Sequence, residues 1–351
     1  MTPSRRVLVT DDGGGQARSA VAAVRALAQA GYEPAVAASG SGSLAAASRH
    51  TRRVVAVPPP DDGEYASTIR SFVLDGGYLA TFPSSDAALL ALGAPVEQLL
   101  DKLALATQSE AAGFGALQSR SYRSAEALLL HAQQLDYPVV VKPIFSRFPA
   151  RRAAEPSDLC QLPLGSGPLL VQPWIDDPMR AVAGVVWDGD LVAVVHQRYL
   201  RTWPPDCGTA AAAETVAPDL EVEGRLLTLL AGYSGIFQAQ FAGDFLLDLN
   251  PRVYGSLPLA VASGVNLPAI LCALLRGEVV ERRRARPGVA YRWLEGDLRH
   301  ILAGVRAGRL SVAGAASALR PRRHTAHSVF SATDPGPQLA RIGHILASVR
   351  P

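Results

Sequence analysis

The run FLLDLNPRV at residues 245–253 places polar side chains inside an otherwise apolar strand. Asp248 and Asn250 are two residues apart, and Arg252 follows them. Side chains two apart on a strand project from the same face of the sheet, so we expect a carboxylate and an amide side by side. A buried pair of this kind needs a partner. This face therefore either holds a ligand or carries a polar pair satisfied within a hairpin.

The preceding run GIFQAQF, residues 235–241, is the expected hairpin partner of this strand. A three-residue loop, 242–244, would pair Phe241 with Phe245 and put Gln240 on the face of Asp248 and Asn250. A two-residue loop would send Gln240 to the opposite face. We expect the three-residue loop. It gives two amide oxygens and one carboxylate, which are hard ligands suited to Mg²⁺, or Mn²⁺, together with water and phosphate.

Lysine is scarce in this chain. The 34 basic residues include only two lysines, Lys102 and Lys142, and all the others are arginine. Where arginine serves as the ordinary surface cation, a retained lysine indicates a need for a compact, flexible ammonium rather than a planar guanidinium. Lys142 ends the short apolar run PVVVKP, and Lys102 opens a predicted helix.

The first hundred residues alternate short apolar strands with helices, a pattern typical of a parallel sheet of Rossmann type. The run DDGGGQAR after the first strand suggests a dinucleotide site. Such a site needs a small residue where Arg18 stands and an acidic residue after the second strand, and both are missing. The sequence thus argues against NAD. The glycines form a tight turn or face a substrate.

Further along the chain, short strands are predicted at 138–143 and 167–175, with an amphipathic helix at 124–137 before them. A hairpin is predicted over 181–201, because Asp188-Gly189 is a strong two-residue turn signal. Residues from 262 onward have a mostly helical pattern.

The composition describes a soluble globular protein, with 48% hydrophobic and 19% charged residues. No apolar run approaches the ~20 residues of a membrane span, so no membrane partner is expected. Three scattered cysteines indicate a reduced, cytoplasmic protein without a disulfide framework. A net charge of +3 makes a nucleic-acid partner unlikely on charge grounds.

Over about residues 1–290, these features in their order resemble the ATP-grasp superfamily. The resemblance is carried by DK at 101–102, YPVVVKP at 137–143, LLVQPWI at 169–175, FQAQF at 237–241 and the D-x-N-P-R strand. It is closest to the carbamoyl-phosphate-synthetase-like, carboxylate–amine ligase branch.

The resemblance implies an α/β fold: a Rossmann-like predomain followed by an ATP-grasp fold, in which two α+β subdomains clamp ATP. The implied domains are a predomain at 1–100, a lid subdomain at 101–175, a C-terminal subdomain with the metal and phosphate site at 176–290, and a helical extension at 291–351.

The resemblance also implies roles for individual residues. Lys102 and Lys142 would contact the phosphates of ATP, and Asp177 would bind its ribose. The hinge strand would receive adenine along its backbone at Gln172, Pro173, Trp174 and Ile175.

Magnesium would be held between the phosphates by Gln240, Asp248 and Asn250. Arg252, with Arg198 or Arg201, would face the transferring phosphoryl group or the acyl phosphate.

The sequence departs from the family pattern in several places. Gln240 and Asp248 stand where glutamate is commoner, and Pro173 stands at a hinge position that is usually glutamate. The loop after Lys142, residues 144–159, has no glycine, although the family's phosphate-covering loop is Gly-rich. Either its arginines at 147, 151 and 152 replace the backbone contacts, or the grip on ATP is weakened.

The resemblance implies an ATP-dependent ligase that activates a carboxylate as an acyl phosphate and joins it to an amine or another nucleophile. Its partners would be small carboxylates and amines, and a homodimer is an open alternative. Two other functions also stay open: carbamoyl-phosphate or carboxylase chemistry, and nucleotide binding without turnover.

Overall fold

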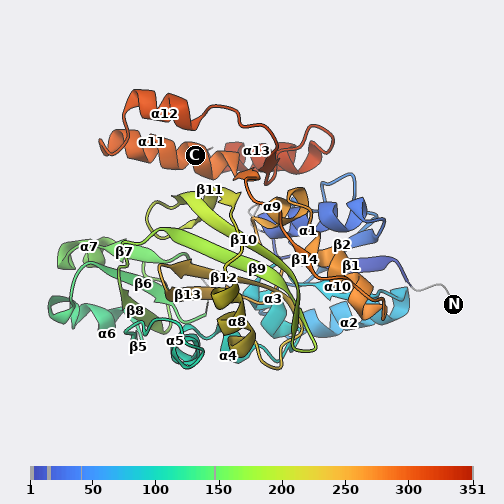
Figure 1. Ribbon diagram of the computed structural model, residues 1–351, viewed down its shortest axis with the longest axis horizontal. Helices are drawn as coiled ribbons and strands as arrows, with labels where there is room; N and C mark the ends of the chain where they lie inside the picture. The colour runs from blue at the N-terminus through green and yellow to red at the C-terminus, as the bar shows by residue number, and fades with distance from the viewer. Residues whose placement is uncertain (1–3, 14–16, 41, 146–147, 350–351) are drawn as a thin grey trace.

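The N-terminal part of the chain forms a four-stranded parallel sheet, shown in blue in the computed structural model of Figure 1. The structure describes residues 4–13, 17–40, 42–145 and 148–349. The strand order is β3-β2-β1-β4, as expected for a Rossmann-type sheet. Its elements are β1 (Arg6–Asp11), α1 (Arg18–Gln29), β2 (Glu33–Ser39), β3 (Arg53–Val57), α2 (Tyr65–Gly76), β4 (Ala80–Phe82) and α3 (Asp86–Ala91).

A small antiparallel sheet follows, with strand order β5-β8-β6-β7. Two short helices, α4 (Glu97–Leu100) and α5 (Lys102–Ala111), lead into it. Its own elements are β5 (Arg120–Tyr122), α6 (Ala125–Leu129), η1 (Ala132–Gln134), β6 (Val139–Pro143), β7 (Arg151–Ala153), α7 (Pro156–Gln161) and β8 (Leu169–Pro173).

The helix predicted over 124–137 is much shorter than expected. Ser124 caps the start of α6, which ends at Leu129 and gives way to the single 3₁₀ turn η1. The core of the small sheet takes up Leu128, Ala132 and Leu135, while Leu130 is 82% exposed. The apolar residues therefore reach the core without one continuous helix.

The third sheet is the largest, with strand order β13-β12-β9-β10-β11-β15-β16 and β14 beside β10. The predicted turn at Asp188-Gly189 is confirmed: Trp187 pairs with Asp190, and both turn residues have positive φ, 48° and 83°. The strands are β9 (Met179–Trp187), β10 (Asp190–Trp203), β11 (Thr209–Thr215), β12 (Gly235–Ala242), β13 (Phe245–Asn250), β14 (Arg283–Arg284), β15 (Ala290–Arg292) and β16 (Thr325–His327).

Helices cover both faces of the large sheet. On one face, α8 (Leu220–Leu229) and α5 share a core with the aromatic side chains Phe237 and Phe241. On the other face, α9 (Leu257–Ala262) and α10 (Leu267–Leu275) pack in a core that also contains β1 and α1. This shared core fixes the N-terminal sheet against the large sheet, and so positions α1 beside the strands that carry the predicted site.

The last sixty residues lie across one edge of the molecule, at the top of Figure 1. They contain the helices α11 (Leu294–Arg306), α12 (Val312–Ala318) and α13 (Gly336–Val349). An ion pair joins this segment to the first helix: Arg25 Nε lies 2.8 Å from Asp334, which is 1% exposed. Among the described helices, none has the length and apolar character needed to cross a membrane.

Candidate active site

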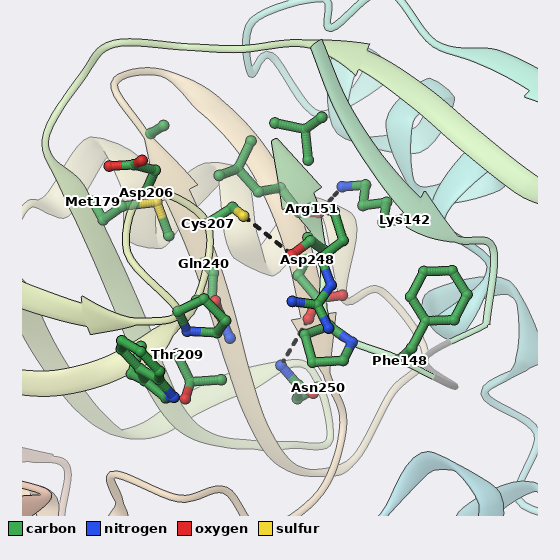
Figure 2. Close-up of a pocket in the computed structure, with 18 of the residues that line it drawn as sticks. Lys142, Phe148, Arg151, Met179, Asp206, Cys207, Thr209, Gln240, Asp248 and Asn250 are labelled. Carbon is green, nitrogen blue, oxygen red and sulfur yellow. Dashed lines mark hydrogen bonds between the residues drawn. The ribbon is translucent and has the colours of Figure 1, made fainter. Parts of the chain in front are cut away.

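A cavity of about 690 Å³ lies between the small sheet, the large sheet and the C-terminal helices. Figure 2 shows its interior, with Gln240, Asp248 and Asn250 projecting into the same space and Lys142 nearby. All the predicted site residues except Arg198 and Arg201 line it: Lys102, Lys142, Gln172, Pro173, Trp174, Ile175, Asp177, Gln240, Asp248, Asn250 and Arg252.

The three oxygen-bearing side chains share one face, but not through the loop that we expected. Ala242 pairs with Phe245, so the turn has two residues, and Gly243 takes a φ of 55°. By itself, this turn would put Gln240 on the wrong face. The register then shifts by one residue: Phe241 pairs with Leu246, but Gln240 pairs with Asp248. Leu247 is therefore an extra, bulged residue. The bulge restores Gln240 and Asp248 as direct partners.

The bulged residue also accepts a hydrogen bond from one of the lysines. Lys142 Nζ donates a hydrogen bond of 2.6 Å to the carbonyl oxygen of Leu247, drawn as a dashed line in Figure 2. Lys142 is 6% exposed. Burial lowers the pKa of its ammonium to about 8, although the nearby Asp248 carboxylate acts in the opposite direction. Among the described residues, the hydrogen bond of this buried cation is to a neutral carbonyl, so Lys142 is well placed to gain from an anionic ligand.

Lys102 approaches the site from the start of α5. The Asp101 side chain caps this helix by accepting hydrogen bonds from the amides of Leu103 and Ala104. Lys102 is thereby fixed in the first turn, where its Nζ lies 3.1 Å from Asp248 Oδ1. Both lysines of the chain thus converge on one strand, β13, from segments forty residues apart in sequence.

Arg252 ties the site to the N-terminal sheet. Its Nη2 donates to Asn250 Oδ1 at 2.8 Å, and its Nε donates to Asp86 at the start of α3. Asn250 Nδ2 in turn donates to Asp248 Oδ2 at 3.3 Å. These contacts orient the Asn250 amide. Arg252 lines the cavity while it remains paired with Asp86, which is only 6% exposed.

The strand β8 and the residues after it form the wall expected to receive adenine. Gln172 is buried, and its Nε2 donates to Ser119 Oγ at 2.7 Å. The amide of Trp174 donates to the carbonyl of Pro138 at 3.0 Å, so this N–H already has a partner. The Trp174 ring stacks against the guanidinium of Arg152, 5.0 Å from its centroid.

Asp177 and two arginines lie near the same wall of the cavity as β8. Asp177 packs against the turn of the hairpin, where a Cβ added to Gly243 would lie only 2.4 Å from Asp177 Oδ2. Of the arginines suggested to replace a Gly-rich loop, Arg151 lines the cavity and Arg152 stacks on Trp174. Arg147 lies outside the described residues.

Arg198 and Arg201 do not line the cavity, and both are held in ion pairs elsewhere. Arg198 binds Glu214 and its side chain is 60% exposed. Arg201 binds Asp297, which is fully buried. Alternation on β10 explains the first placement, because the adjacent Tyr199 faces a cavity. A register shift at Leu200 explains the second, since the extra residue takes Arg201 off the face of Tyr199.

The donor set fits a hard divalent cation. No hydrogen-bond partner of the Gln240 side chain is recorded in the described part of the chain, so its oxygen is available. Asp248 supplies one carboxylate, and Asn250 one amide oxygen. Within the described residues, no group of three or more His, Cys, Asp and Glu side chains is arranged to hold a metal ion. These three protein ligands would suit Mg²⁺ only with phosphate and water completing its shell.

A second cavity of about 500 Å³ adjoins the first. The residues shared by the two are Arg18, Thr209, Gln240, Asn250 and Arg252. The family resemblance implies that the predomain and the residues around 196–210 and 252–257 shape the substrate pocket, and all three regions contribute to this lining. In the run DDGGGQAR, the glycines were expected to turn or to face a substrate, and Arg18 broke the dinucleotide pattern. Asp12, Gly13 and Arg18 line the second cavity.

The fold is shared with known proteins, although the sequence is not. Neither the models of protein families nor the curated proteins contain a match to this chain. Among solved structures, the L-amino acid ligase from Bacillus licheniformis has a TM-score of 0.58 at 13% identity, covering 83% of this chain and 79% of that one.

Two other solved structures are similar to the same extent. The biotin carboxylase domain of the Hydrogenobacter thermophilus 2-oxoglutarate carboxylase, in complex with MgADP, ADP and bicarbonate, has a TM-score of 0.59 at 16% identity, over 83% of this chain and 74% of that one. N5-carboxyaminoimidazole synthetase from Staphylococcus aureus has a TM-score of 0.57 at 12% identity, over 79% of this chain and 78% of that one. The chain therefore has the ATP-grasp fold, as its sequence predicted.

Proposed function

We propose that this protein is an ATP-dependent ligase that activates a substrate carboxylate as an acyl phosphate and joins it to an amine. One observation carries the proposal: the first cavity gathers the chain's two lysines and three oxygen ligands around β13. Lys102 and Lys142 reach this strand from separate segments, and Lys102 Nζ lies 3.1 Å from Asp248. The similarity in fold to a ligase, a carboxylase domain and a synthetase supports ATP as the substrate of this site.

ATP would lie along the first cavity, with adenine against β8 and its triphosphate over β13. The two ammonium groups would bind phosphate oxygens, and binding would replace the contacts that the lysines now make with Asp248 and the Leu247 carbonyl. Gln240, Asp248 and Asn250 would hold Mg²⁺, which neutralises phosphate charge when it is bound. Arg252 lines both cavities and would face the phosphoryl group during transfer.

In the first step, a carboxylate oxygen of the substrate attacks the γ-phosphorus of ATP. The bond from that phosphorus to the β,γ-bridging oxygen breaks, and ADP leaves. In the second step, the amine nitrogen attacks the acyl carbon, the C–O bond to phosphate breaks, and inorganic phosphate leaves as the nitrogen loses a proton. The protein contributes position and positive charge, so no covalent protein nucleophile is required.

The acyl phosphate must be kept from water between the two steps. The small sheet, β5 to β8, forms one wall of the cavity and would act as a lid. Its loop residues Phe148 to Arg151 already line the cavity beside Cys207, whose thiol donates to the carbonyl of Ala150 at 3.1 Å. Closing this wall over ATP would exclude water from the reacting groups.

The proposal is tested first by binding and then by trapping. Mg-ATP and a non-hydrolysed ATP analogue should both raise the melting temperature, and the absence of any shift at millimolar nucleotide would refute an ATP site. With a competent carboxylate, hydroxylamine should intercept the acyl phosphate and yield a hydroxamate. ADP release without hydroxamate would contradict carboxylate activation, and a thermal shift without ADP release across a broad carboxylate panel would identify a nucleotide-binding protein without turnover.

A further inference from the structure

The second cavity is lined mostly by polar side chains. Apart from the residues it shares with the first, its lining includes four serines, two tyrosines and Gln238, together with the carboxylate of Asp12. For the hydroxyls of Tyr199 and Tyr254, no hydrogen-bond partner is recorded among the described residues. A cavity with so many hydrogen-bonding groups is suited to a small polar molecule rather than an apolar one.

Arg18 stands where the two cavities meet. It is the first residue of α1, and its guanidinium is held on three sides by neutral groups. Nη1 donates to Tyr291 Oη at 3.2 Å, Nη2 donates to Thr209 Oγ1 at 2.9 Å, and the central carbon lies 3.8 Å from the centroid of the Trp293 ring. These contacts orient the guanidinium without neutralising its charge.

Two other arginines, one in the cavity and one on the same helix as Arg18, are held in ion pairs with carboxylates. Arg252 binds Asp86, and Arg25, seven residues along α1 from Arg18, binds Asp334. For Arg18, no carboxylate lies within 4.0 Å in the parts of the chain that the structure describes. The nearby Glu295 carboxylate interacts with Arg18 only beyond this distance. A partly buried guanidinium that is held in place and forms no direct ion pair is prepared for a carboxylate or phosphate ligand.

Asp12 is the acidic counterpart in the same cavity. It follows β1, and its side chain accepts a hydrogen bond from Ser85. No Lys, Arg or His nitrogen lies within 4.0 Å of its carboxylate within the described ranges. Its Oδ1 is buried and lies near the Tyr65 hydroxyl, which interacts with the carboxylate but makes no hydrogen bond of ordinary geometry to it. Besides Arg252, which is paired with Asp86, the cavity therefore presents one positive and one negative charge, and neither forms an ion pair within 4.0 Å among the described residues.

We propose that the second cavity binds a zwitterionic amino carboxylate, with its carboxylate on Arg18 and its ammonium group on Asp12. This inference rests on the proposed ligase function, because it makes Arg18 the group that presents the carboxylate to ATP. The shared position of Arg18 places that carboxylate at the phosphate end of the first cavity. The C-terminal segment contributes indirectly, since Tyr291 and Trp293 hold the guanidinium.

The experiment measures ADP release with Mg-ATP and each of the twenty L-amino acids. For the most active amino acid, we then compare its amide, which lacks the carboxylate, and its α-hydroxy analogue, which lacks the ammonium group. The amino acid should be active and both analogues much weaker. An equally active hydroxy analogue would overturn the role of Asp12, and no stimulation by any amino acid would overturn the zwitterion.

Two variants locate the charges. Arg18→Gln should raise KM for the amino acid about 10- to 100-fold, because a charged hydrogen bond is lost, and should leave KM for ATP unchanged. Asp12→Asn should have the same selective effect and should reduce the preference for the amino acid over its hydroxy analogue. An unchanged KM for the amino acid in Arg18→Gln would refute the assignment. Arg18→Lys, which keeps the charge but loses the planar fork, provides the same test if the glutamine variant fails to fold.

Arg25→Gln is the matched control, because it removes the same charge from the same helix. It breaks a buried ion pair with Asp334 and should lower the melting temperature without changing KM for the amino acid. A parallel rise of KM in Arg25→Gln would show that Arg18 acts only by docking the C-terminal segment. The Mg-ATP thermal shift should persist in every variant, and its absence from the wild-type protein would instead refute the ATP site.

Discussion

The two cavities meet at Asn250 and Arg252, yet they are assembled in different ways. In the first, the three oxygen ligands lie on one hairpin, β12 and β13, and the two lysines reach it from α5 and β6. The second takes Arg18 from α1, Tyr199 from β10 and Tyr254 from the segment before α9. Strand alternation sets the spacing of Asp248 and Asn250 in the first cavity, whereas only packing brings the groups of the second together. Because the first cavity is proposed to bind ATP, variants there should lower turnover with every carboxylate substrate. Variants in the second cavity should raise KM for the amino acid alone.

The largest effect is expected from Asp248→Asn in the first cavity. The amide keeps the size of the side chain but removes the only carboxylate of the proposed metal site, and it breaks the contact with Lys102. We expect turnover to fall about 10²- to 10³-fold or more while the melting temperature without nucleotide stays close to wild type. Steady-state ADP release with and without added Mg²⁺, together with thermal denaturation, provides the measurement.

Asp190→Asn is the matched control for this loss of charge. Asp190 is exposed and pairs with Arg282 on the surface, far along the sheet from the cavity. Turnover should be unchanged in this variant. If Asp248→Asn unfolds the protein while activity per folded molecule persists, the pair of Asp248 and Asn250 is structural and the metal assignment is wrong.

An intermediate effect is expected from pH, through Lys142. Burial lowers the pKa of its ammonium to about 8 in the free protein. The charged form binds phosphate, so affinity for ATP should be full below pH 8 and should fall above it, by up to about tenfold per pH unit for one linked proton. Measurement of the ATP dissociation constant from pH 7 to pH 9.5 tests this, and a flat profile would contradict a role of Lys142 in phosphate binding.

Lys142→Arg sharpens the same test. A guanidinium is wider than an ammonium and stays charged throughout this range, so the variant should lose most of its ATP affinity and also the pH dependence. Arg283→Lys, an exchange at an exposed position, should change neither. Full ligase activity in Lys142→Arg would remove the argument based on the scarcity of lysine.

The smallest effect is expected from Arg198→Ala, which separates the sequence interpretation from the structure. The family resemblance placed Arg198 beside the transferring phosphoryl group, whereas the structure pairs its exposed side chain with Glu214, which also binds Arg322. Loss of this surface pair should cost about 1 kcal/mol or less in stability and leave turnover unchanged. A large fall in kcat with an unchanged melting temperature would return Arg198 to the active site.

Two β-bulges mark the limit of prediction from sequence at this site. Alternation on a strand was sufficient to place Asp248 beside Asn250. The facing of Gln240 was predicted correctly for the wrong reason, because a two-residue turn and a bulge at Leu247 replace the expected three-residue loop. On β10, the shift at Leu200 has the opposite consequence and removes Arg201 from the cavity face. A single extra residue moves every later side chain of the strand to the opposite face of the sheet. No residue type in either run indicates that a bulge is present.

The sequence by itself determined the hairpin turn at Asp188-Gly189 through turn chemistry, the shared face of Asp248 and Asn250 through strand alternation, and the fold class through the resemblance of short motifs in their order. Only the tertiary structure decided which charges lack partners. Arg18, Arg25 and Arg252 are the same residue type, yet Asp334 and Asp86 pair with the last two, while Arg18 is held by Tyr291, Thr209 and Trp293 and forms no ion pair within 4.0 Å among the described residues. Those partners lie up to 309 positions away in the chain, and contacts at such separations are set by the packing of whole elements rather than by any pattern along the sequence.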